Sequence, residues 1–276
     1  MSRRLSVALA LGLSATAALA FPATAEPVDD LLEALRLESV LEIMREEGLV
    51  YADELEAELF PAAGGENWRD SVERLYALPA MMESFRASFA AEMPESSIAP
   101  ALAYFESEEG QRIIGLEISA RIAQMDESIE AASRETLETM QEQGDPRLDL
   151  LEAFSEANDL VEANVVGSLN ANYAFYTGLV DGGAFAFDLT EDQILADVWQ
   201  QEPEIRSDTR DWLFSYLALA YQPLSDEEVQ SYIDFSETEA GQDLNRALFA
   251  GFDTMLVGIS RGLGLAAARF MGGQDI

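Results

Sequence analysis

The chain contains no cysteine and no histidine, and its 16 basic residues include no lysine. Without cysteine there is no disulfide, thiol nucleophile or thiolate metal site. Without histidine there is no imidazole ligand and no serine–histidine or cysteine–histidine catalytic pair. The hydrophobic core must therefore hold the fold alone, and 276 residues, of which 49% are hydrophobic, are sufficient for that. We expect no cofactor and no metal.

Positive charge is scarce, with 16 basic residues against 52 acidic ones and a net charge of −36. Such a chain repels nucleic acid and anionic lipid headgroups, so nucleic acid is not an expected partner. The acids are scattered along helical patterns, as on a solvated face. The local group Glu106, Glu108 and Glu109 lacks the loop spacing of a calcium site. Acidic residues that begin a helix explain it better.

The N-terminus resembles a secretory signal. Arg3 and Arg4 precede an apolar run from Leu5 to Leu19, and Ala23-Thr24-Ala25 is a small-x-small cleavage site. The apolar run is too short to span a bilayer. We therefore expect a signal peptide over residues 1–25, export by general secretion, and a periplasmic or secreted protein. The mature chain shows no further run of membrane length, so no transmembrane span is expected.

The remaining pattern is helical, because apolar residues recur at steps of three and four and no convincing strand occurs. The spacing predicts a first long helix that stops at Gly48 and a separate short helix over Asp53–Leu59. It also predicts one helix from Ile114 toward Met140, ended by Gly144. The apolar face of that helix would carry Ile118, Ile122, Met125 and Ile129.

One short stretch occurs twice, first from Tyr104 as Tyr-Phe-Glu-Ser-Glu-Glu-Gly-Gln-Arg-Ile. It returns from Phe235 as Phe-Ser-Glu-Thr-Glu-Ala-Gly-Gln-Asp-Leu, at a constant offset of 131 residues. The same offset relates Trp68 to Trp199, and Phe85 to Tyr216. We therefore predict an all-α protein of two duplicated multi-helix units, residues 26–145 and 146–276, that form one bundle-like body.

The residue types of this stretch predict a helix–cap–helix corner. Ser107 and Thr238 are natural N-cap residues three positions before a glycine. A glycine at the third helical position weakens a helix by about 1 kcal/mol relative to alanine, so we expect Gly110 and Gly241 to permit close packing. The predicted structural motif comprises Ser107, Gly110, Gln111, Thr238, Gly241 and Gln242.

Paired aromatic-x-x-Ser/Thr-x-x-Gly-Gln corners behind a secretory signal resemble the bacterial family called domain of unknown function 2059. The resemblance covers the regions from Tyr104 to Met125 and from Ser225 to Met255 well, and the rest loosely. It implies an all-helical exported protein without an established activity. It therefore supplies no catalytic residues.

The segment from Gly167 to Phe187 has the most unusual composition of the chain, with small, aromatic and amide residues together. Such side chains could line a ligand pocket, and the candidates are Asn172, Tyr173, Tyr176 and Phe185. A tightly packed central helix explains the same composition. Similarly, the small residues Gly251, Gly258, Gly262 and Ala266 of the C-terminal helix favour a helix contact, within the chain or in a dimer.

These observations favour a non-catalytic binding or interaction module. Its expected partner is an envelope protein, a second copy of the chain, or an apolar small molecule held between the two units. The alternative is a cell-wall glycan hydrolase that uses two carboxylates. An aromatic-lined cavity between the units would favour binding, whereas a cleft with two facing carboxylates, at least one of them buried, would favour the enzyme.

Overall fold

The computed structural model describes residues 25–61, 64–185 and 189–271. Within these ranges every regular element is a helix and there is no strand, so the predicted all-α class is confirmed. The predicted signal segment, apart from Ala25, lies outside the described residues. The helices are α1 (Ala25–Ala34), α2 (Leu37–Leu59), α3 (Gly65–Leu75), α4 (Leu78–Glu92), α5 (Glu95–Phe105), α6 (Glu108–Gln124), α7 (Glu127–Gln143), α8 (Arg147–Ala157), α9 (Leu160–Asp181), α10 (Glu191–Gln200), α11 (Glu202–Tyr221), α12 (Asp226–Ser236) and α13 (Glu239–Met271).

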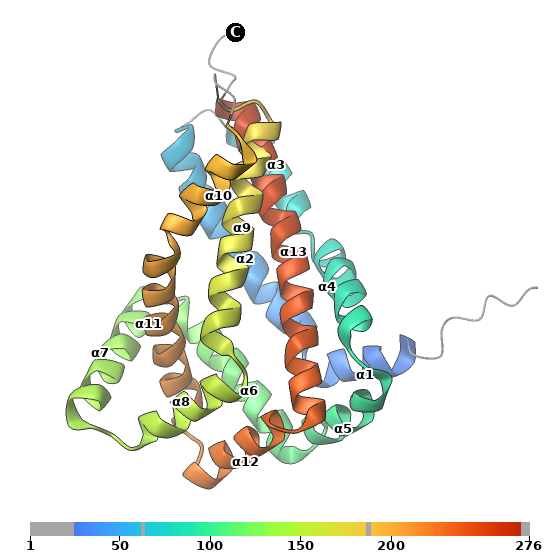
Figure 1. Ribbon diagram of the computed structural model, residues 1–276, viewed down its shortest axis with the longest axis vertical. Coiled ribbons are helices and arrows are strands. Elements are labelled where there is room, and N and C mark those ends of the chain that lie inside the picture. Colours follow the sequence, from blue (N-terminus) through green and yellow to red (C-terminus); the bar gives the residue numbers. More distant parts are fainter. Residues whose placement is uncertain (1–24, 62–63, 186–188, 272–276) are drawn as a thin grey trace, which may run out of the picture.

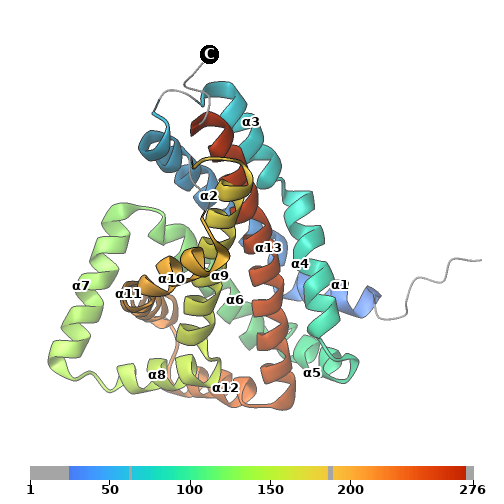
Figure 2. The same ribbon diagram turned by 45° about the horizontal axis from the view of Figure 1, so that its top comes forward.

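The longest helix, α13, runs beside α9 through the middle of the molecule (Figure 1). On its other side α13 packs along α4, and this arrangement is also visible in the turned view (Figure 2). Helix α11 packs against α6, α7 and α9. The short helices α5, α8 and α12 gather at the end of the molecule where α13 begins.

Glycines allow α9 and α13 to approach closely. A Cβ atom on Gly178 would lie 2.3 Å from the backbone oxygen of Arg261, and one on Gly264 would lie 2.1 Å from that of Phe175. Nearer the start of α13, Gly251 faces the ring of Phe85. The small residues of the C-terminal helix therefore serve contacts within the chain, although Gly258 faces open space.

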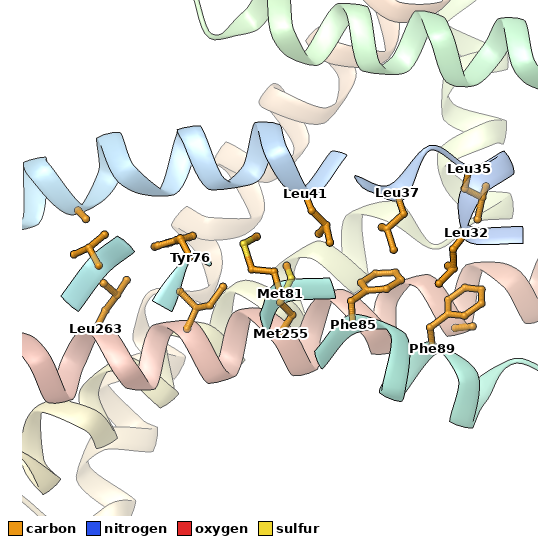
Figure 3. Close-up of a cluster of buried hydrophobic side chains, with 14 of the residues drawn as sticks. Leu32, Leu35, Leu37, Leu41, Tyr76, Met81, Phe85, Phe89, Met255 and Leu263 are labelled. Atoms are coloured by element: carbon orange, nitrogen blue, oxygen red, sulfur yellow. The ribbon is translucent and has the colours of Figure 1, made fainter. Parts of the chain in front are cut away.

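Two main hydrophobic cores hold the helices together. The larger lies between α1, α2, α4 and α13, where Leu41, Met81, Phe85 and Met255 meet (Figure 3). The second joins α6 and α7 to α8, α11 and α12. Each core combines residues from before and after position 145, so the two predicted units share their cores instead of each enclosing its own.

The predicted stop at Gly48 is wrong, because α2 continues through it and includes the segment Asp53–Leu59. A Cβ atom on Gly48 would lie 2.0 Å from the Cε1 atom of Tyr76. The glycine therefore accommodates an aromatic ring from the end of α3 and does not end the helix. Side-chain packing, which the local pattern does not reveal, gives this glycine its role.

The single helix predicted from Ile114 toward Met140 is also wrong. Helix α6 ends at Gln124, and Asp126 begins α7 by accepting a hydrogen bond from the backbone N–H of Ser128 at 2.9 Å. The chain bends there, so three of the apolar residues at this bend lie on the surface. They are Ile122, Met125 and Ile129, with 53%, 40% and 37% of their surface exposed.

The two tryptophans at the offset of 131 are not equivalent. Trp68 is completely buried near the start of α3 and donates its indole N–H to the backbone oxygen of Ala52 at 3.1 Å. Trp199 is 59% exposed near the end of α10. The offset of 131 thus relates two tryptophans of different exposure. The residues of the other pair, Phe85 in α4 and Tyr216 in α11, lie on helices that pack against α13 and α7, respectively.

Candidate ligand-binding cavity

Both copies of the doubled stretch form the predicted capped corner. The Ser107 hydroxyl oxygen accepts from the N–H of Gly110 at 3.0 Å, and that of Thr238 accepts from Gly241 at 3.0 Å. Each hydroxyl also donates to the carbonyl three residues earlier, at 2.6 Å. A Cβ atom on either glycine would lie 2.3 Å from a carbonyl oxygen of the preceding helix. The expectation of close packing at these glycines is therefore confirmed.

The glutamines of the stretch connect each corner to a distant helix end. Gln111 donates through Nε2 to the backbone oxygens of Ala34 and Phe105, and both distances are 2.7 Å. Gln242 donates in the same way to Ala157 and Ser236, again at 2.7 Å. The last carbonyl groups of a helix have no donor within the helix. The two amides thus supply donors to such carbonyls at the C-terminal ends of α1, α5, α8 and α12.

The two corners meet across the molecule through reciprocal contacts. Arg112 of the first corner pairs with Glu228 at the start of α12. Asp243 of the second corner accepts from the hydroxyl of Ser97 at the start of α5. Arg112 and Asp243 are 131 residues apart, and so are Ser97 and Glu228. Between these contacts, the ring of Tyr104 stacks on that of Phe235.

A cavity of about 250 Å³ opens beside this meeting point. Helices from both predicted units surround it, chiefly α6, α8, α11, α12 and α13. Its wall is largely aromatic, formed by Phe105, Phe154, Trp212, Tyr216, Tyr221, Tyr232, Phe235, Phe249 and Phe252. The polar side chains in the wall are Glu117, Asn158, Asn164, Ser236 and Asn245.

Most of these polar groups are already committed to the protein. Asn158 donates to the oxygen of Phe154 and to the hydroxyl of Ser236, each at 3.0 Å. Asn245 and Asn164 each donate to a backbone carbonyl. These bonds fix the wall, and they leave Glu117 as the one formally charged side chain among the described residues that line this cavity.

Glu117 is a partly buried carboxylate among aromatic side chains. The hydroxyl of Tyr221 donates to its Oε1 atom at 2.7 Å, and Tyr232 supplies a second side-chain hydrogen bond. The hydroxyl of Tyr216 donates to its backbone oxygen at 3.1 Å. Burial raises the pKa of Glu117 to about 7, because the charged form loses hydration, and the two tyrosine hydrogen bonds partly oppose that rise.

The nearest basic group on α6 does not neutralise this carboxylate. Arg121, one turn further along, makes a two-pronged ion pair with Glu47 of α2, at 2.7 Å and 3.0 Å. No salt bridge to Glu117 occurs among the residues that the structure describes. Burial and the negative charge of Glu117 also raise the pKa of Tyr216 and that of Tyr221.

Two further cavities adjoin the first. One of about 680 Å³ shares Asn164, Trp212 and Phe252 with it and has a more polar wall that includes Arg121 and Asp253. The other, about 200 Å³, reaches toward α2 and again includes Glu117. The three cavities therefore share walls along the seam where α6, α11 and α13 come together.

The four ligand-binding candidates predicted from the sequence lie elsewhere along α9 and after it. Asn172 donates to Gln201 at 3.1 Å, and the hydroxyl of Tyr173 donates to Glu191 at 2.9 Å, so both face α10 and its end. Tyr176 and Phe185 pack on the edge of the main core. None of the four lines the cavities described above. Their role in ligand binding stays a prediction, and Phe187 lies outside the described residues.

Comparison of the two corners at the offset of 131 could have revealed Glu117 from the sequence. Its counterpart is Leu248, and both line the cavity. Likewise Ile114 corresponds to Asn245, and Arg121 to Phe252. At each of these three pairs one copy has a polar residue and the other an apolar one, so the lining of the cavities differs between the two copies.

The chemistry available in the cavity is limited. Two-carboxylate hydrolysis requires a general acid and a second carboxylate across the substrate. Glu117 is alone in that respect among the described lining residues. The described chain also contains no cluster of three or more acidic residues placed to hold a metal ion. A partly open cavity lined by aromatic rings with one acidic group is instead suited to holding a small molecule.

Comparisons of the chain with family models, with curated proteins and with solved structures give no match. Among the described helices, α13 is long and apolar enough to cross a membrane by length and composition alone. In the present arrangement this helix packs along α9 and α4.

Proposed function

We propose that this protein is an exported, non-catalytic binding protein that holds a small, largely apolar molecule between its two units. The single observation that carries the proposal is the aromatic cavity around Glu117, with its wall drawn from both units. Pockets of this composition bind ligands by excluding water from apolar surface, and a few polar groups orient the molecule. The proposed resemblance to domain of unknown function 2059 is compatible with this role, since that family implies no catalytic residues.

Duplication is a second part of the proposal. Six helices of the first unit, α1 to α6, would correspond in order to α8 to α13, with α7 as the connection. The matching corner hydrogen bonds of Gln111 and Gln242 support this assignment, as does the left-handed backbone before α2 and α9, where Arg36 and Asp159 both have φ of 51°. Where a cavity lies at the junction of two copies, the lining residues of one copy can change without disturbing the fold.

Export is the third part. A signal peptide over residues 1–25 predicts that the mature chain begins at Glu26. N-terminal sequencing of the protein from a periplasmic or secreted fraction tests this directly. A protein retained in the cytoplasm with Arg3 and Arg4 still attached would contradict it.

Native mass spectrometry of the protein purified from its own host tests the binding role. We expect a bound small molecule in the wild-type protein and its loss in Leu248→Trp, because a larger side chain fills the cavity. Leu195→Trp is the matched control, since Leu195 is an exposed residue of α10 and the change adds the same side chain outside the cavity. Retention of the ligand by Leu248→Trp would exclude this cavity as the binding site.

Trp212 provides an independent optical measurement. It lines two of the cavities and stacks on Tyr216 with ring centroids 5.6 Å apart. Ligand binding should change the tryptophan fluorescence of the wild-type protein and of Trp199→Phe, but not that of Trp212→Phe. A ligand-induced change that persists in Trp212→Phe would place the ligand near another tryptophan.

A further inference from the structure

The cavity has one carboxylate that no described basic side chain of its lining balances. Glu117 contributes a carboxylate, and the rest of the lining is aromatic, aliphatic or neutral and polar. A buried charge without a partner is destabilising, so natural proteins pair such groups or use them for binding. The partner can therefore be a ligand.

Hydrogen bonding at Glu117 is arranged for the ionised form. Tyr221 and Tyr232 both act as donors to the carboxylate. An ionised carboxylate accepts only, and its two oxygens offer about four lone-pair sites. Two donors leave acceptor capacity that a positively charged or N–H-bearing ligand can fill, whereas an anionic ligand would be repelled.

No described side chain around Glu117 takes the place of a positively charged ligand. Of the described titratable side chains that act on it or on its tyrosines, one is basic, and that one, Arg121, is already paired with Glu47. The remaining titratable groups are Glu47 of α2, Tyr104 of α5, Glu109 of α6, Tyr216 and Tyr221 of α11, and Tyr232 of α12. All of these are neutral or negative.

The aromatic wall strengthens the same preference. Trp212 and Tyr216 lie parallel to each other on one side, and Phe235 and Phe252 contribute further rings. The face of an aromatic ring attracts a cation that sits within about 6 Å of its centre. A cation inside this wall would thus meet ring faces and one carboxylate, and it would not lose binding energy to a competing basic side chain.

We infer that the ligand of this cavity is a small organic cation, an amine or quaternary ammonium compound with an apolar body, and that Glu117 is its counter-charge. The inference rests on the proposed binding function and specifies the ligand class. The volume of about 250 Å³ sets the size. It exceeds the roughly 150 Å³ that holds benzene and falls below the about 300 Å³ at which pockets for drug-sized ligands begin.

Three probes of similar shape and different charge test the inference: 2-phenylethylammonium, 2-phenylethanol and phenylacetate. Isothermal titration calorimetry at pH 8 on the full mature protein should show that the cation binds at least tenfold tighter than the alcohol, with the anion weakest. Salt at about 0.5 M removes general attraction to the acidic surface, because the screening length then falls to roughly 4–5 Å.

Glu117→Gln keeps the shape of the side chain and removes its charge. We expect it to reduce affinity for the cation to that of the alcohol, while affinity for the alcohol stays within about twofold of wild type. Asp253→Asn is the matched control, because Asp253 lines the neighbouring larger cavity and not the first. It should leave the cation preference unchanged.

The outcomes separate the two proposals. Equal binding of the alcohol and the cation by the wild-type protein would overturn the inference and leave the binding function standing. A cation preference that survives Glu117→Gln would also overturn it. Failure of all three probes, together with no bound molecule in native mass spectrometry, would remove the binding function itself.

Discussion

The ring of Tyr104 lies face to face with that of Phe235, with centroids 4.0 Å apart and planes inclined by 7°. These residues are the first positions of the two copies of the doubled stretch, so each corner meets its own counterpart. Phe105 completes the cluster with its edge toward Phe235, at a centroid distance of 5.4 Å. The meeting of like elements places the cavity where the two predicted units join.

The hydroxyl of Tyr104 is buried in this stack and has no hydrogen-bond partner among the residues that the structure describes. An unsatisfied buried hydroxyl destabilises a fold by about 1–3 kcal/mol, so Tyr104→Phe should raise the free energy of unfolding by about 1 kcal/mol. Urea unfolding followed by circular dichroism measures the change. Tyr221→Phe is the contrast, because its hydroxyl donates to Glu117 and its removal should destabilise the protein. A loss of stability in Tyr104→Phe would show that the hydroxyl has a partner.

The corner glycines should resist substitution. In Gly110→Ala or Gly241→Ala the new Cβ atom would lie 2.3 Å from a backbone oxygen, which cannot yield as a flexible side chain can. We expect each change to destabilise the protein by about 2 kcal/mol or more. Gly258→Ala is the control within α13, because its added Cβ would have no described neighbour within 4 Å outside the local helix backbone, and it should stabilise by about 0.5–1 kcal/mol. Thermal unfolding distinguishes the three variants, and similar midpoints would contradict the packing argument.

The corner glutamines Gln111 and Gln242 should contribute about equally to the stability of the fold. Gln111→Ala and Gln242→Ala each leave two backbone carbonyls without a side-chain donor, and we expect a loss of about 1–3 kcal/mol in each case. Gln230→Ala removes an exposed amide of α12 that donates to the exposed Asp234 four residues on, and it should change stability by less than about 0.5 kcal/mol. Denaturant titrations of the three variants provide the comparison. Loss at one corner alone would mean that the matching hydrogen bonds are not equivalent in energy.

Stability should depend on pH through Glu117. Its pKa rises from an ordinary value of 4.5 to about 7 in the fold, mainly because of burial. The unfolded chain therefore releases this proton at lower pH, and the contribution of Glu117 is fully present below pH 4.5 and is lost as the pH rises to about 7. A shift of this size corresponds to about 3 kcal/mol.

Glu117→Gln isolates this effect from the many other acids. The stability of the wild-type protein minus that of the variant should fall by about 3 kcal/mol between pH 4.5 and 7.5. Unfolding free energies measured at several pH values with both proteins test it. A difference that stays constant over this range would show that Glu117 has an ordinary pKa.

The sequence by itself determined the helical class and the capped corners. Both depend on local chemistry: apolar spacing, hydroxyl caps such as Ser107, and a glycine three residues later. The chain also restricted its own chemistry through the residues it lacks. The helix break at Asp126 was not predicted, because a favourable helical pattern extends across it. The continuation of α2 through Gly48 was not predicted either, because Tyr76, whose ring explains this glycine, is distant in sequence.

Only the tertiary structure decided where the candidate site lies. Glu117 is one of 52 acidic residues that the sequence scatters along its helical patterns, and its unusual environment arises from Tyr221 and Tyr232, more than 100 residues away. Burial, cavity walls and charge balance depend on contacts between distant helices, which no local pattern contains. The sequence thus determines which elements form, and the packing of α6, α11 and α13 determines which of their side chains meet.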